Sequence, residues 1–289
     1  MKRAGLVVVV VLTVAAFVVA QQQPSNSGSS TKQAGAAAQA QPQGKRLPQA
    51  KTQAEFDAYK ATIANQNDPA AMEKAADDFA AKFPTSELRT VLYRGAMRGY
   101  QNANNGDKLS EVAQKLLKID GDDPEALVNV AEVIAEHTRD TDLDKDQHFD
   151  EAMKNAQRAL ETIETDVPPG MTESQMEAYK GLLRSTAYSI MGTVAFNKEK
   201  YSDAEGYYRK SIDAYPSQPD PVVILRLTVA LDRQEKYPEA LKQANRAVEL
   251  TQDGTAAGTA ARHERDRLVQ LTGGSAPAPP ASTPTPQPK

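Results

Sequence analysis

Between residues 52 and 272, apolar residues recur at spacings of three and four along most of the chain. This period corresponds to one face of an α-helix, and there are few runs of β-branched residues that would favour strands. Glycine, proline and short polar clusters interrupt the pattern at regular intervals and mark where successive helices end. The pattern predicts an all-α domain over residues 52–272.

The two flanking regions have a different composition. Residues 21–51 are rich in Gln, Ser, Ala, Gly and Pro and hold almost nothing that could be buried, which is typical of a disordered linker. Residues 273–289 alternate proline with small residues and are expected to form an extended, polyproline-like disordered tail.

The first 20 residues have the pattern of a secretory signal peptide. Lys2 and Arg3 precede an apolar run from Leu6 to Val19, and Ala20 offers a small-residue cleavage site. The alternative is an uncleaved anchor formed by residues 4–20, because the run approaches the roughly 17–25 residues that span a bilayer. Both alternatives predict an exported protein, periplasmic or secreted, which contacts a membrane only through this segment if the segment is retained.

One part of the helical region shows residues at fixed intervals. Counted from Gly192, an aromatic residue lies four positions earlier, and a small residue, a second aromatic and a proline follow 12, 16 and 24 positions later. Ala240 takes a second-helix place in the following unit. The repeat positions are Tyr188, Met191, Gly192, Ala204, Tyr208, Pro216 and Ala240.

These intervals resemble the tetratricopeptide repeat (TPR), a helix–turn–helix unit of 34 residues. The resemblance implies a right-handed α-α superhelix, a TPR solenoid, of about five helix pairs closed by a C-terminal capping helix within "GTAARHERDRLVQL". With the leader, it points to the exported bacterial type. The phrases "FPTS" and "AAKFP" show a weaker similarity to periplasmic TPR proteins that serve outer-membrane assembly.

Packing accounts for the intervals. Gly192 and Ala204 are expected where the two helices of a unit cross closely, since larger side chains there would cost roughly 1–3 kcal/mol through overpacking. Tyr188 and Tyr208 fill the space beside that contact. Pro216 ends the second helix because it cannot continue the backbone hydrogen bonding.

The resemblance also implies where a partner binds. The first helices of successive TPR units line a groove that takes an extended or helical segment of another protein. The predicted function is therefore a non-catalytic protein–protein interaction scaffold in the cell envelope, with a protein or peptide as partner. The predicted groove residues are Arg94, Arg98, Gln101, Asn102, Ser189, Thr193, Asn197, Leu225, Val229 and Arg233.

Composition and motifs argue against other classes. The chain has no cysteine, and with 34 basic and 38 acidic residues its net charge of −4 gives no reason to expect nucleic-acid binding. It lacks the glycine-rich phosphate loops, the HExxH motif and the GxSxG motif. No enzyme activity and no cofactor are predicted, although an enzyme with a site assembled from dispersed residues stays an alternative.

A second alternative is a calcium- or metal-responsive protein that uses the acidic loop of residues 140–151. Asp140, Asp142, Asp144 and Glu151 stand at spacings that imitate the calcium loop of an EF-hand. Lys145 departs from that loop, because it occupies the sixth position, where glycine makes the sharp turn. The competing interpretation is a solvated acidic insertion.

Overall fold

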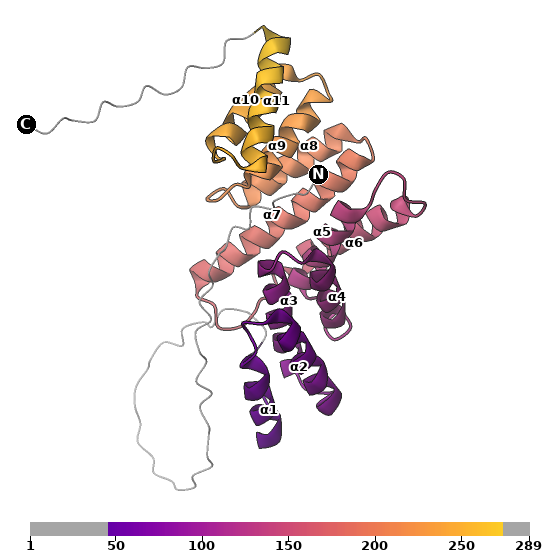
Figure 1. Ribbon diagram of the computed structural model, residues 1–289, viewed down its shortest axis with the longest axis vertical. Coiled ribbons are helices and arrows are strands. Elements are labelled where there is room, and N and C mark those ends of the chain that lie inside the picture. The colour runs from indigo at the N-terminus through magenta and orange to yellow at the C-terminus, as the bar shows by residue number, and fades with distance from the viewer. Residues whose placement is uncertain (1–45, 274–289) are drawn as a thin grey trace, which may run out of the picture.

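The computed structural model describes residues 46–273 (Figure 1). Over these residues it contains eleven helices and no strand. The predicted leader, the linker up to residue 45 and the tail from residue 274 lie outside the described residues. The helices are α1 (Gln53–Ile63), α2 (Pro69–Lys82), α3 (Leu88–Asn102), α4 (Gly106–Leu117), α5 (Pro124–His137), α6 (Lys145–Thr162), α7 (Glu173–Asn197), α8 (Tyr201–Ala214), α9 (Pro221–Asp232), α10 (Tyr237–Glu249) and α11 (Ala256–Thr272).

The helices form five successive pairs, α1–α2 through α9–α10, and α11 follows the last pair (Figure 1). Each helix packs mainly on its neighbours in sequence, while the first helices of successive pairs also touch one another, as α5 touches α7. Each pair can bury its apolar face only against the next pair, which is the principle of a solenoid. The predicted all-α solenoid of five helix pairs and a terminal helix is confirmed.

Sequence signals at the helix ends explain the boundaries. Three helices, α2, α5 and α9, begin at an Asp-Pro dipeptide in which the aspartate side chain accepts backbone N–H groups and the proline takes the first helical position. The aspartates are Asp68, Asp123 and Asp220. These dipeptides set where each helix starts.

A recurring turn joins the two helices of units two, four and five. In each, a residue other than glycine adopts a positive φ of 53–59°, and the next residue donates its N–H to a carbonyl five positions back, which closes the end of the first helix. The bonds are Asn105 to Tyr100 (3.0 Å), Lys200 to Ala195 (2.9 Å) and Lys236 to Leu231 (3.0 Å), beside Asn104, Glu199 and Glu235. The same backbone turn in three units shows that they are structurally equivalent.

The core is a chain of three apolar clusters rather than one centre. One cluster spans α2 to α5, one spans α5 to α7, and one spans the end of α7 to α11. Leu117 and Ile134 contact both of the first two clusters, and Tyr207 contacts both of the last two. The burial is therefore continuous along the stack.

The contact between α7 and α8 is built around Gly192. A Cβ atom on Gly192 would lie 2.6 Å from two ring carbons of Tyr208, whose side chain is 1 % exposed. Ala204, Met191 and Ala240 are buried, Tyr188 is partly buried, and α8 ends two residues before the exposed Pro216. Tyr208 thus packs directly onto Gly192, whereas the sequence analysis placed its ring beside the crossing.

Two features depart from the sequence expectation. Helix α7 begins at Glu173, well before Tyr188, and its first half packs Tyr179 and Leu183 into the middle cluster. Upstream of α1, part of the expected linker contacts the connection between α2 and α3: Lys51 donates to the carbonyl of Thr85 at 3.0 Å.

Candidate functional site

The candidate surface is formed by the row of first helices, α3, α5, α7 and α9, continued by α11. We call it the first-helix face. Among these helices, α5 contacts α7, α7 contacts α9, and α9 contacts α11. The predicted groove residues of the second, fourth and fifth units all belong to, or directly end, α3, α7 and α9.

Arg94 and Arg98 are engaged within the protein. Arg94 pairs with Asp123, and Arg98 donates from Nε and Nη2 to Glu125 at 2.8 Å each. The Tyr179 hydroxyl donates to the same glutamate at 3.3 Å. These contacts tie α3 to α5 and α7, so both arginines have a structural role, and their part in binding a partner stays a prediction.

Burial and neighbouring charges act in opposite directions on the pKa of Glu125 in this cluster. The side chain of Asp123 is fully buried and that of Glu125 is 9 % exposed. Burial alone would raise the pKa of Glu125, but the charges of Arg98 and Arg94 and the hydrogen bonds hold it below its ordinary value. The Glu125 carboxylate therefore stays charged inside the stack, where the loss of an arginine partner would be costly.

The predicted residues of α7 differ in exposure. Ser189 is buried, and Asn197 is exposed as the last residue of the helix. Thr193, between them, is partly buried and donates to the Ser189 carbonyl at 3.1 Å. Gln101 and Asn102 are exposed at the end of α3. The exposed members, Gln101, Asn102 and Asn197, thus stand at the C-terminal ends of α3 and α7.

A cluster that the sequence analysis missed joins three first helices. Arg226 of α9 donates to Thr193 of α7 at 3.1 Å and to Glu136 of α5 at 2.9 Å. Burial, then the charge of Glu136, raises the pKa of the neighbouring Glu132 to about 7. Arg226 and Glu136 are 90 positions apart in sequence, so no local spacing could have indicated the pair.

An open groove lies between α9 and α11. Its volume is about 700 Å³, and Leu225 and Val229 of α9, two of the predicted groove residues, form one wall. The opposite wall is mostly small side chains of α11, so the space between the helices is not filled. The lining residues are Leu225, Val229, Gly254, Ala256, Thr259, Ala260, His263 and Glu264. Arg233 is exposed just beyond the end of α9.

The acidic loop is not assembled as a metal site. Asp142 accepts the backbone N–H of Arg139 at 2.8 Å, Asp144 lies 3.3 Å from His148, and Asp140 lies 4.0 Å from Lys145. Glu151 is exposed within α6. Over residues 46–273, no group of three or more His, Cys, Asp or Glu side chains could hold a metal ion.

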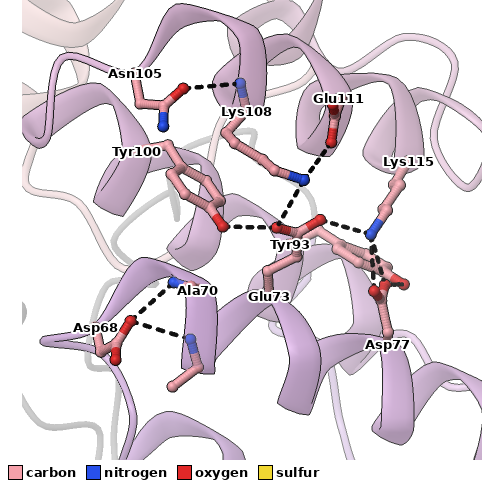
Figure 2. A network of polar contacts seen from close by, with 11 residues as sticks. Asp68, Ala70, Glu73, Asp77, Tyr93, Tyr100, Asn105, Lys108, Glu111 and Lys115 are labelled. Atoms are coloured by element: carbon pink, nitrogen blue, oxygen red, sulfur yellow. Dashed lines mark hydrogen bonds and ion pairs between the residues drawn. The ribbon is translucent and has the colours of Figure 1, made fainter.

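A second polar network, shown in Figure 2, lies among α2, α3 and α4. Lys115 of α4 contacts Glu73 at 2.8 Å and Asp77 at 2.7 Å, both on α2. Tyr100 and Tyr93 of α3 donate to these carboxylates at 2.7 and 2.8 Å. Each of these groups bonds to another member, so the network joins the first two units.

Comparison with known proteins finds distant structural likeness and no matching family. No family model and no curated protein matches it. One similar solved structure is the MamA protein, with 15% identity and a TM-score of 0.47, and the match covers 68% of this chain and 92% of that one. Another is TTC0263, a thermophilic TPR protein of Thermus thermophilus, with 12% identity, a TM-score of 0.46, and coverage of 75% of this chain and 100% of that one. The pilF protein of Pseudomonas aeruginosa has 16% identity and a TM-score of 0.48, and the match covers 77% of this chain and 96% of that one. Likeness at this level carries no information about function, and the fold rests on the helix pairs themselves.

In the part of the chain that the structure describes, no helix is both long and apolar enough to cross a membrane.

Proposed function

We propose that this protein is a non-catalytic interaction scaffold of the cell envelope that binds a segment of another protein on its first-helix face. The groove between α9 and α11 carries the proposal. It combines the aliphatic side chains of Leu225 and Val229 with small residues and a polar edge at His263 and Glu264. An open, mainly apolar groove of this kind suits a peptide segment whose apolar side chains anchor it.

The rest of the first-helix face explains why binding concentrates at this end. Arg94, Arg98 and Arg226 are held by carboxylates of other units, so a partner would have to break existing ion pairs to use them. Leu225 and Val229 are partly buried and face open space, so a partner gains apolar burial there without such a loss. The groove is therefore the favourable part of the face.

The proposed location rests on the first 20 residues. A basic start, an apolar run and Ala20 indicate export. Fractionation of cells with N-terminal sequencing tests this: export with cleavage gives a chain that begins at Gln21, and retention as an anchor gives an uncleaved chain in the membrane fraction. A full-length chain in the cytoplasmic fraction would refute export.

Site-directed photo-crosslinking in the producing cells tests the binding proposal. A photoreactive amino acid at Thr259, exposed in the groove, should crosslink to another protein, and the added substitution Ala260→Arg should abolish the product by filling the groove. The matched control places the same amino acid at Ser202, exposed on α8 and away from the first-helix face. No crosslinked protein from Thr259, or the same products from both positions, would contradict the proposal.

A further inference from the structure

The wall of the groove continues into a segment of the same chain. Helix α11 ends at Thr272, and Gly273 follows in the left-handed conformation with φ of 61°. Residues 274–289, here called the C-terminal segment, come next. We propose that the C-terminal segment occupies the groove between α9 and α11 of its own chain when no partner is bound. This goes beyond the proposed function, because it requires no second protein.

The segment is long enough to reach the groove. Going back along α11 from Gly273 to Ala260 covers about 20 Å at about 1.5 Å per helical residue. A chain of the length of the C-terminal segment would reach about 50 Å at about 3.1 Å per residue if it were extended as polyproline. Gly273 allows the chain to leave the helix axis at once, since a left-handed residue after a helix redirects the backbone. Both length and exit geometry permit the return.

The chemistry of the segment suits the groove. It contains six prolines, with alanine, serine and threonine as most of the rest, and Lys289 is its one charged side chain. The groove offers Leu225, Val229 and Ala260 for these small apolar groups, and the His263 ring offers a flat surface for a proline. Glu264 is already paired with Arg267 at 2.8 Å, so a docked segment without acidic or basic side chains nearby would not leave this carboxylate without a partner.

Because the C-terminal segment is covalently attached beside the groove, even a weak affinity would be enough to keep it bound there. A segment attached through one glycine is present at the groove at an effective concentration in the millimolar range. A proline-rich chain also loses little conformational freedom when it docks, because it is extended beforehand. An affinity too weak to hold a free peptide would therefore keep the groove covered, and a partner would have to displace the segment.

The absence of cysteine makes a direct test possible. The substitution Ser282→Cys provides one attachment point for a benzophenone photo-crosslinker in the purified full-length chain, and mass spectrometry locates the crosslinks. We expect them on the groove walls of the same molecule, with a several-fold loss in the Ala260→Arg background. The matched control Ala81→Arg, exposed on α2, should leave the yield unchanged. The same label on Ser29→Cys should give no groove crosslinks.

Three results would overturn the inference: crosslinks scattered over the surface, crosslinks insensitive to Ala260→Arg, or crosslinks between two chains. A mixture of isotopically light and heavy protein identifies the last case. The outcome is separable from the proposed function. Groove crosslinks in the purified chain support the inference even if Thr259 captures no protein in cells. Capture of a protein by Thr259 in cells, with no groove crosslinks in the purified chain, supports the proposed function alone.

Discussion

The N-terminal units, α1 to α5, and the C-terminal units, α7 to α11, form the same helix pairs with different contacts between them. In the N-terminal units, charged side chains join neighbouring units, as Lys115 joins α4 to α2 and Arg94 joins α3 to Asp123 at the start of α5. In the C-terminal units charged pairs also join neighbouring units, as Arg209 of α8 meets Glu239 of α10 at 2.8 Å, but the tightest approach between two helices of a pair is made by a glycine. Gly192 receives the Tyr208 ring, and the fully buried alanines of α8 and α10 are Ala204, Ala240, Ala244 and Ala247.

The difference follows the strength of the repeat signature. A seam of small residues works only if glycine or alanine stands at the crossing point, so it enforces a spacing that can be read in the sequence. Long charged side chains can adjust through several rotatable bonds and tolerate drift in that spacing. The intervals are accordingly clearest in the unit around Gly192, less clear in the second unit and weak in the first.

The largest expected effect concerns the charged contacts. Arg94→Met keeps the apolar stem of the side chain but leaves the buried Asp123 carboxylate without its cation, beside Glu125. We expect the free energy of unfolding to fall by about 3–5 kcal/mol. Urea denaturation followed by circular dichroism measures it.

The matched control for this substitution is Lys74→Met. Lys74 pairs with Asp78 at 2.7 Å on the exposed surface of α2, where solvent screens the interaction, so no measurable change is expected. Equal effects of the two substitutions would show that the buried cluster around Asp123 does not hold the N-terminal units together.

The next effect concerns the small-residue seam. Gly192→Ala adds a Cβ atom 2.6 Å from the Tyr208 ring, so the helices must separate or the ring must move. We expect a loss of roughly 1–3 kcal/mol by overpacking, measured as a lower melting temperature. Gly192→Trp should lower it further.

Gly206→Ala makes the same chemical change on α8, where an added Cβ atom meets nothing within 4 Å. Alanine is the better helix former there, so we expect a gain of roughly 0.5–1 kcal/mol. If both glycine variants were stabilised, close packing at Gly192 would not be the reason for the intervals in the sequence.

These contacts also show what could be predicted from the sequence. Helix pairing and the crossing at Gly192 follow from local spacing, which the chain displays directly. The pairing of Arg98 with Glu125 and of Arg226 with Glu136 does not, because each joins residues of different units whose distance depends on how the units stack. Arg94 and Arg98 lie on the first helix of the second unit, as predicted, but the carboxylates that hold them could not be predicted from local spacing.

The smallest expected effect lies at the junction of the two regions, where Glu132 of α5 faces Glu136, Arg226 and Asp220. Burial and the charge of Glu136 raise the pKa of Glu132 to about 7 in the folded protein from 4.5 in the unfolded chain. Because the folded state then holds the proton more tightly, stability from this group is complete below pH 4.5 and is lost as the pH rises toward 7.

Glu132→Gln mimics the protonated carboxyl at every pH and should remove this loss. Relative to the unsubstituted chain, the variant should gain about 1–2 kcal/mol at about pH 8 and nothing at about pH 4. Melting curves across this range measure the difference, and Glu151→Gln, an exposed change on α6, is the matched control with no pH-dependent gain expected. A gain independent of pH would mean that the amide stabilises by a new hydrogen bond. A gain confined to high pH would show that charge, as well as steric fit, limits how the C-terminal units join the N-terminal ones.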